Sequence, residues 1–328
     1  MNPEGSRFES VYSESLERFI SFKRSLGYES KHVIPPLRDF DRFCCKSGVE
    51  DAGLTSELLR AWSGSRKGES PQARYKRMAA IRQFACFLND TGCPSYIPRL
   101  PKHPSSSFAP HIFTHDELSR LFRAVDELSS EARVSCVSVA PAMPALMRTL
   151  YATGIRSGEA VALTVGDVDL EKGLLLVRES KNGEDRIVPV SETLAEVLRD
   201  YARPLLDAAE KDDPFFARMD GKAIDQTTAY GWFRRMLERA GVPHPGGGKG
   251  PRLHDLRHTF AVHSLARMVD AGLDLYYTLP ILSQYLGHKS LDATGGYVRL
   301  TEEMFPGVIR ASNAICAYVL PEVADGDK

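Results

Sequence analysis

The stretch Leu-His-Asp-Leu-Arg-His-Thr-Phe at residues 253–260 brings two imidazoles and a guanidinium onto one helical face. On a helix, His254 lies beside both Arg257 and His258, because residues three and four positions apart are surface neighbours. These groups repel one another when all are charged, so the pattern favours a site that receives an anion. A zinc site is not favoured, because His254, His258 and His263 lack the Glu of the His-Glu-x-x-His motif and Arg257 opposes a cation.

A second polar pattern follows at residues 285–297, which read Tyr-Leu-Gly-His-Lys-Ser-Leu-Asp-Ala-Thr-Gly-Gly-Tyr. Gly287 is suited to end one helix and Ser290 to cap the next. His288 is thereby expected in the connecting loop, upstream of Tyr297.

Two further patterns lie upstream. Residues 153–159, Thr-Gly-Ile-Arg-Ser-Gly-Glu, follow an apolar helical run and contribute Arg156 and Glu159. Residues 173–190 contain two β-prone runs around a Lys-Asn-Gly turn, which predicts a hairpin with Lys181 at its turn.

The rest of the chain has helical periodicity, so the predicted fold is mainly α with a small β-hairpin or sheet (α+β). Four short predicted helices form a bundle over residues 1–102. Apolar residues at helical spacing from Phe8 onward predict the first, and Thr55 and Ser70 are expected to open the third and fourth.

Residues 103–111 are rich in Pro and Ser and are interpreted as a linker. A capping box, Thr114 to Glu117, then opens a second domain over residues 112–328.

The charge of the chain is balanced overall but not by segment. The 328 residues carry 42 basic and 43 acidic side chains, for a net charge of −1. Residues 1–107 carry +5 and the remainder −6. A basic cluster on a small helical module favours nucleic-acid binding. Its members are Arg66, Lys67, Arg74, Lys76, Arg77 and Arg82.

No stretch approaches the ~20 apolar residues that span a bilayer, and the first residues lack the apolar core of a signal peptide. We therefore expect a cytoplasmic protein with no membrane partner.

Taken in chain order, the four polar patterns resemble the tyrosine recombinase (phage integrase) family, whose catalytic set runs Arg, Lys, His-x-x-Arg, His or Trp, Tyr. The resemblance covers about residues 112–300, and the helical first domain is similar in architecture to the family's SAM-like core-binding domain. The residues that match the catalytic positions are Arg156, Lys181, His254, Arg257, His288 and Tyr297.

The resemblance implies a site-specific DNA recombinase, integrase or transposase that transfers strands through a 3′-phosphotyrosine link, without metal, ATP or another cofactor. Arg156 and Arg257 are then expected to bind the non-bridging phosphate oxygens, since a guanidinium can donate two parallel hydrogen bonds to such oxygens. Tyr297 is the expected nucleophile, and Lys181 the expected general acid for the leaving 5′ oxygen.

The remaining expected roles are supporting ones. His254 and His288 donate hydrogen bonds to the phosphate, and His254 can also shuttle the proton of the nucleophile. Glu159 and His258 are expected to orient these groups. In the glycine-rich loop at residues 246–250, Lys249 is expected to contact DNA phosphate.

The family further implies two partners: double-stranded DNA with specific recombination sites, and further copies of the chain in a homotetrameric synapse. The C-terminal tail is expected either to join neighbouring protomers or to pack on its own domain. The expected location is the nucleoid. Two alternatives stay open. One is a type IB topoisomerase-like enzyme with the same chemistry, and the other is a DNA-binding regulator without catalysis.

Overall fold

The computed structural model divides into two compact units, Met1–Phe108 and Ala109–Lys328. The residues that it describes are 8–28, 32–104, 110–132, 135–178, 185–204, 209–246 and 250–287. Within these ranges, no helix combines the length and apolar character needed to cross a membrane.

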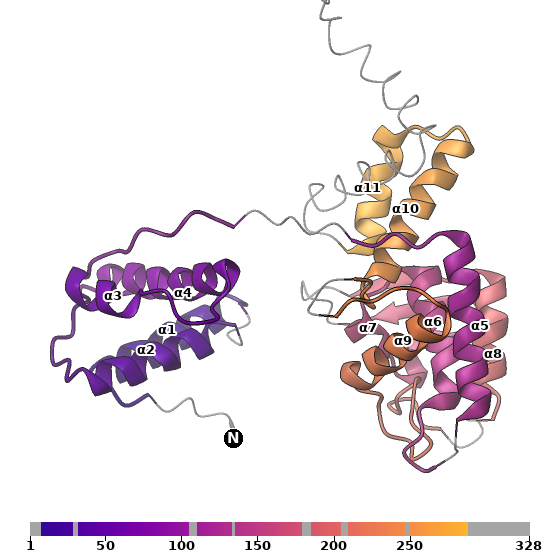
Figure 1. Cartoon of the computed structure of the whole chain (residues 1–328), viewed down its shortest axis with the longest axis horizontal. Coiled ribbons are helices and arrows are strands. Elements are labelled where there is room, and N and C mark those ends of the chain that lie inside the picture. The colour runs from indigo at the N-terminus through magenta and orange to yellow at the C-terminus, as the bar shows by residue number, and fades with distance from the viewer. Residues whose placement is uncertain are drawn as a thin grey trace, which may run out of the picture. The chain divides into compact units, whose positions relative to one another are not determined.

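The first unit is a bundle of four helices (Figure 1): α1 (Ser13–Ser25), α2 (Ile34–Lys46), α3 (Ser56–Trp62) and α4 (Pro71–Asp90). Two of them begin at the predicted caps. The side chain of Thr55 accepts a hydrogen bond from Leu58 N, and that of Ser70 accepts one from Ala73 N. These side chains satisfy backbone donors that a helix start leaves without partners.

The start of the first helix differs from the sequence prediction. The apolar period predicts that the helix includes Phe8, but α1 begins at Ser13. The buried carboxylate of Asp41 instead accepts hydrogen bonds from Glu9 N (2.9 Å) and Ser10 N (3.0 Å). This side-chain cap holds the segment against α2, and Phe8 still reaches the core.

The second unit is mostly helical and carries one small sheet. Its α-helices are α5 (His115–Glu131), α6 (Met143–Thr153), α7 (Ser157–Val161), α8 (Glu192–Ala202), α9 (Gln226–Arg239), α10 (Asp255–Asp270) and α11 (Leu275–Leu286). The predicted capping box is confirmed at the start of α5, where Thr114 and Glu117 each bind the other's backbone N–H.

The predicted hairpin is confirmed and gains a third strand. Strands β1 (Val168–Asp169), β2 (Leu174–Val177) and β3 (Arg186–Pro189) form an antiparallel sheet in the order β1-β2-β3. Leu175 pairs with Val188, and both are buried. The sheet therefore turns one face towards the core, as the alternation of strand side chains requires.

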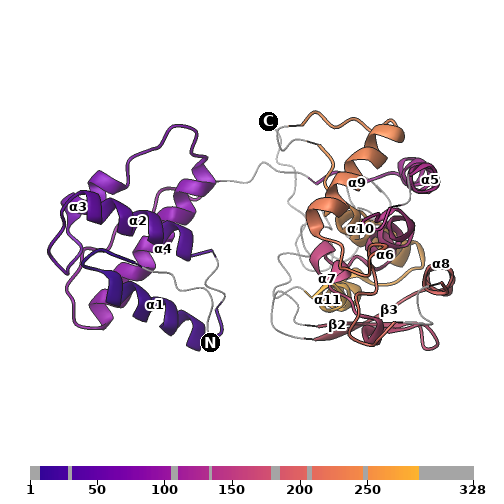
Figure 2. The ribbon, with the colours of Figure 1, turned by 90° about the horizontal axis from the view of Figure 1, so that it is seen from below.

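Helix α11 lies between α10 and the sheet and thus connects the parts of the second unit (Figure 2). On one side, Leu282 and Leu286 pack against Val262 and Leu265 of α10. On the other side, Tyr285 and strand β3 line a common hollow. The C-terminal end of α11 is therefore held from two directions.

Candidate active site

Three arginines converge on the last turn of α11. Arg186 donates a hydrogen bond to the carbonyl oxygen of Tyr285 (3.3 Å), and Arg257 donates one to that of Leu286 (2.6 Å). Arg156 donates one to that of Gly287 (3.1 Å). Three consecutive carbonyl groups thus each bind a different guanidinium, at the helix end where the macrodipole is negative.

Arg156 is placed by a helix end and a helix start. Gly154 ends α6 in the left-handed region (φ 62°), which turns the chain so that Arg156 caps α7. Glu159 in the first turn of α7 accepts hydrogen bonds from the backbone N–H of Arg156 (2.9 Å) and from its guanidinium (2.7 Å). The guanidinium is therefore oriented by a residue of its own motif.

Glu159 also binds Arg186 of β3, whose Nη1 and Nη2 lie 3.1 Å and 2.6 Å from the two carboxylate oxygens. Burial acts to raise the pKa of Glu159, but hydrogen bonds from Arg186 and Arg156 outweigh it and lower the pKa to about 2. Glu159 is therefore ionised at neutral pH and shared by two cations.

Arg257 is buried inside the second unit, with 2% of its surface exposed. Besides the bond to Leu286, it donates a 2.7 Å hydrogen bond to the carbonyl oxygen of Gly154. Arg257 thereby links α10 with the turn that carries Arg156 and with the end of α11.

The two histidines of the His-x-x-Arg-His stretch lie edge to face, with ring centroids 4.8 Å apart. Burial, together with the neighbouring charges of His258 and Arg257, lowers the pKa of His254 to about 3. Burial likewise lowers the pKa of His258 to about 4, although Asp255 opposes the shift. Both imidazoles are therefore neutral at pH 7 in the protein without DNA, as expected for groups crowded by arginines.

Asp255, between His254 and Arg257, fixes the start of α10 to the segment that enters the second unit. Its buried carboxylate accepts hydrogen bonds from Arg252 N (2.9 Å) and His111 N (3.4 Å). The hydroxyl of Thr259, one turn further on, accepts a 3.0 Å hydrogen bond from Phe113 N. The motif helix and residues 111–113 therefore form one packed assembly.

An open hollow of about 480 Å³ lies beside His254. It is lined by Ser157, Gln226, Thr227, Tyr230, His244, Gly250, Arg252 and Leu253. A ligand on the surface of the second unit can therefore reach the edge of the His254 ring through this hollow.

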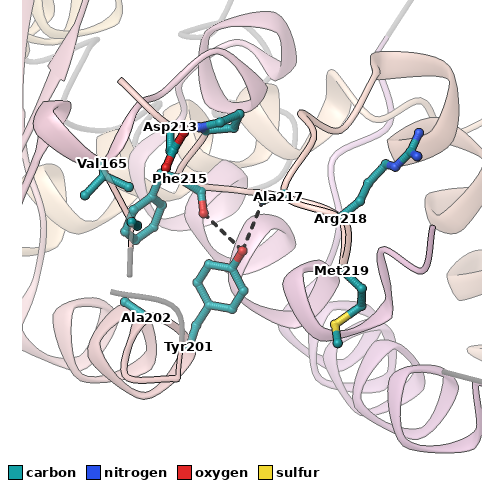
Figure 3. Close-up of a pocket in the computed structure, with 11 residues that line it drawn as sticks. Val165, Tyr201, Ala202, Asp213, Phe215, Ala217, Arg218 and Met219 are labelled. Atoms are coloured by element: carbon teal, nitrogen blue, oxygen red, sulfur yellow. Dashed lines mark hydrogen bonds between the residues drawn. The ribbon is translucent and has the colours of Figure 1, made fainter. Parts of the chain in front are cut away.

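Another cavity, of about 240 Å³, lies away from this site, near Tyr201 and Phe215 (Figure 3). The hydroxyl of Tyr201 donates to the carbonyl oxygen of Phe215 (3.0 Å) and accepts from Ala217 N (3.2 Å). None of the sequence-predicted site residues lines this cavity. Its central polar group is already satisfied within the protein, so we assign it no part in the site.

The structure thus brings together four of the predicted residues of the second unit, Arg156, Glu159, His254 and Arg257, with His258 packed on His254. Lys181, His288, Tyr297 and Lys249 lie outside the described residues. The described strands end at Val177 and resume at Arg186, on either side of Lys181. Among the described residues, no group of three or more His, Cys, Asp or Glu side chains could hold a metal ion.

Sequence reasoning missed Arg186 and Asp255 as members of this assembly. Arg186 stands five residues after Lys181, at the start of the second β-prone run, and a charged residue at that place is ordinary in a strand. A usable signal for Asp255 was its position inside the stretch 253–260. An acidic side chain among cationic neighbours is expected to bind one of them or a backbone N–H.

In the first unit, Arg77 does not fit the expectation of a DNA contact. Its side chain is buried, and its guanidinium binds both carboxylate oxygens of Glu69 (2.6 and 2.8 Å). It also donates to the carbonyl oxygens of Trp62 and Gly64, each at 3.0 Å. Arg77 therefore holds the loop before α4 in place, and it is not among the DNA contacts proposed below.

The other members of the basic cluster lie nearer the surface. Lys67 and Lys76 are exposed. Arg66 is exposed and pairs with Asp39 (2.6 Å), and Arg82 donates to the carbonyl oxygen of Pro98 (3.0 Å). Arg74, half-buried, donates to the carbonyl oxygen of Ser63 (3.3 Å). Their positive charge remains accessible from solvent to different degrees.

Comparison with known proteins connects this geometry to one family. The sequence model of the phage integrase family matches residues 111–304. The putative integrase/recombinase y4rE of Sinorhizobium fredii is 32% identical over 89% of this chain and 92% of its own length. The tyrosine recombinase XerA of Pyrococcus furiosus is 26% identical over 94% of this chain and 97% of its own.

A solved structure has the same fold. The XerH site-specific recombinase bound to a palindromic difH substrate, in a post-cleavage complex, superposes with a TM-score of 0.62. The superposition covers 94% of this chain and 85% of XerH, at 21% sequence identity.

Proposed function

The chain belongs to the phage integrase family, and we propose that it is a site-specific DNA recombinase that cuts and rejoins strands through a covalent tyrosine link. Its substrate is double-stranded DNA that carries specific recombination sites. It acts as a recombinase, integrase or transposase on the nucleoid in the cytoplasm, as a homotetramer in the synapse.

The observation that carries this proposal is the adjacency of two guanidinium groups. Arg156 and Arg257 come from segments 101 residues apart, yet they donate to the neighbouring carbonyl oxygens of Gly287 and Leu286. Two permanent cations side by side favour binding of a phosphate group, because its non-bridging oxygens accept the paired hydrogen bonds that a guanidinium donates. Their own hydrogen bonds to the protein hold them there before a phosphate arrives.

In the proposed reaction, the phenol oxygen of Tyr297 attacks the scissile phosphorus and the bond from phosphorus to the 5′ oxygen breaks. The 3′ end becomes a phosphotyrosine ester, and Lys181 protonates the 5′ oxygen that leaves. Neutral His254 accepts the phenolic proton, and the negative charge of the bound phosphodiester offsets the cations that depress its pKa. Attack of another strand's 5′ hydroxyl reverses these steps without a net loss of phosphodiester bonds.

His288 completes the proposed site as a further hydrogen-bond donor to the phosphate, and His258 keeps His254 in place by ring packing. Tyr285 is a poor alternative nucleophile. Burial raises the pKa of its phenol to about 12, and its ring stacks on Phe260 with centroids 5.6 Å apart.

We assign DNA clamping to the helical bundle of residues 1–102, joined by the linker 103–111 to the catalytic domain of residues 112–328. Lys67 and Lys76, with Arg66, Arg74 and Arg82, supply phosphate contacts there, and Lys249 supplies one on the catalytic domain. Contacts of this kind position the duplex and make affinity depend on salt.

The deciding experiment is covalent trapping on a duplex from the flanks of the gene, nicked so that the leaving strand diffuses away. The wild-type chain and Tyr277→Phe, a matched control at an exposed tyrosine of α11, form a protein–DNA adduct. Tyr297→Phe forms none, and peptide mass spectrometry finds the nucleotide on residue 297. An adduct that persists in Tyr297→Phe, or none with wild type, overturns the proposal.

A second assay separates recombination from topoisomerase activity. Two copies of the trapped site on one plasmid yield the recombined product, and the yield rises with occupancy of both sites. Relaxation of supercoiled DNA at low enzyme ratio without any exchange product contradicts the recombinase assignment and supports the topoisomerase-like alternative.

A further inference from the structure

Glu159 is surrounded by four hydrogen-bond donors, and two of them come from a residue outside the family's catalytic set. Its Oε1 accepts from the guanidinium groups of Arg156 (2.7 Å) and Arg186 (3.1 Å). Its Oε2 accepts from the backbone N–H of Arg156 (2.9 Å) and from Arg186 (2.6 Å). This number of donors saturates an ionised carboxylate.

The charges at this point explain what the second arginine changes. A buried carboxylate with Arg156 as its single cationic partner would neutralise most of that guanidinium's field. With Arg186 as a second partner, the cluster of Arg156, Glu159 and Arg186 carries a net positive charge. Arg156 thereby keeps attraction for a phosphate while Glu159 still fixes its direction.

Arg186 also connects strand β3 to the end of α11. Its Nε donates to the carbonyl oxygen of Tyr285 (3.3 Å), and the guanidinium packs against Gly287, which has a left-handed φ of 67°. A Cβ atom at Gly287 would lie 3.4 Å from Nη1 of Arg186. Gly287, directly after α11, therefore lies against the side chain of this arginine.

Resting on the proposed function, we propose that Arg186 is a positioning residue of the strand-transfer site, which acts through Glu159 on Arg156 and through Tyr285 on the end of α11. It contacts the protein groups that hold the phosphate-binding arginine and does not itself contact the phosphate. The side chain is 13% exposed, as expected for a supporting group behind the reacting surface.

The test compares Arg186→Gln with a matched control, Arg148→Gln. Arg148 makes an equivalent two-pronged pair with Asp126 (2.9 and 2.7 Å) between α6 and α5, away from Glu159. Single-turnover formation of the covalent DNA adduct is timed for each protein. Arg186→Gln lowers the rate constant about 10- to 100-fold, because misplacement of a phosphate-holding group by about 1 Å has effects of this size. Arg148→Gln leaves it within about twofold.

Two further readouts separate positioning from a general loss of structure. Damaged folding lowers the amplitude of adduct formation and the affinity for DNA, whereas misplacement of Arg156 lowers the rate constant with Kd within about twofold. In Glu159→Gln the connection from Arg186 to Arg156 is already broken. Adding Arg186→Gln then removes only the contact with Tyr285 and lowers the rate constant by less than about threefold more.

The outcomes are distinct from those of the proposed function. A wild-type rate constant in Arg186→Gln, or effects of Arg186→Gln and Glu159→Gln that multiply fully, overturns the inference and leaves the recombinase assignment intact. No adduct from the wild-type chain overturns both. If Arg186→Gln does not fold, Arg186→Lys carries the same test, because it keeps a cation but cannot bind both oxygens of Glu159 and the Tyr285 carbonyl together.

Discussion

The guanidinium of Arg257 donates a 2.7 Å hydrogen bond to the carbonyl oxygen of Gly154, across 103 residues of sequence. Gly154 stands two residues before Arg156, so this bond ties the two proposed phosphate-binding arginines to one turn of backbone. The turn depends on the left-handed φ of Gly154, which few other residues adopt without strain.

Gly154→Ala is expected to destabilise the second unit by about 2–4 kcal/mol. The left-handed conformation costs about 1 kcal/mol, and the added Cβ overlaps the ring of Phe260, which adds about 1–3 kcal/mol. Urea unfolding followed by Trp232 fluorescence, with Trp62→Phe in every protein, measures the loss. The control Gly221→Ala has a similar φ of 76° and open space around it, and it loses about 1 kcal/mol. Equal losses at the two positions contradict the clash.

Thr259→Val is expected to destabilise the second unit by about 1–3 kcal/mol, because it removes the acceptor of the buried Phe113 N–H without changing the side chain's shape. Hydrogen exchange at the Phe113 amide is expected to be faster in this variant, because the amide has lost its acceptor. Thr259→Ser retains the hydroxyl and keeps the amide protected. Unchanged exchange in Thr259→Val shows that this bond does not hold the segment to α10.

Stability is expected to fall as the pH decreases from about 6.5 to about 4. Burial lowers the pKa of His254 to about 3 and that of His263 to about 4, below the ordinary value of about 6.5. In this window the unfolded chain binds protons that the folded chain does not. Each such histidine therefore lowers the free energy of unfolding by up to about 1.4 kcal/mol for each unit by which the pH falls. Its stabilising contribution is fully present above the pKa of the unfolded chain.

His263→Gln tests that linkage away from the proposed catalytic groups. Urea unfolding at pH 7, 6 and 5 gives a shallower slope in this variant than in wild type, by up to about 1.4 kcal/mol per pH unit. His103→Gln, at an exposed position of the first unit, keeps the wild-type slope. A His263→Gln slope equal to that of wild type rules out the assignment.

Substitutions of Arg77 and Lys76, which are adjacent in α4, are expected to affect different properties of the protein. Arg77→Met removes the partner of a buried carboxylate and destabilises the first unit by about 3–5 kcal/mol. Lys76→Met changes stability by less than about 0.5 kcal/mol but weakens DNA binding and reduces the salt slope by about 0.9. Thermal unfolding and fluorescence anisotropy at several salt concentrations measure the two effects. Normal DNA binding and salt slope in Lys76→Met remove it from the proposed contacts.

Much of the secondary structure could be predicted from the sequence because its signals are local. Thr55, Ser70 and Thr114 bind N–H groups three residues away, and a side chain that reaches so short a distance can be recognised from spacing alone. Leu175 and Val188 face the core because strand side chains alternate. The order of the polar motifs along the chain could likewise be used without knowledge of the fold, because it is a property of the sequence.

Local patterns failed where the deciding partner was far along the chain. Phe8 has helical spacing, but Asp41 binds the backbone N–H groups of Glu9 and Ser10, and the helix begins only at Ser13. Arg77 lies among basic neighbours in the sequence, yet its fork fits a buried pocket made by Glu69 and two backbone carbonyls.

The sequence by itself determined the helical bundle, the hairpin and the residue types of the site, because short-range hydrogen bonds and periodicity specify them. Only the tertiary structure decided that Arg186 shares Glu159 with Arg156 and that three arginines bind three consecutive carbonyl groups at the end of α11. A guanidinium binds whichever acceptors the packed elements bring within about 3 Å of it. That proximity arises from the packing of α6, β3, α10 and α11 together, which no single segment encodes.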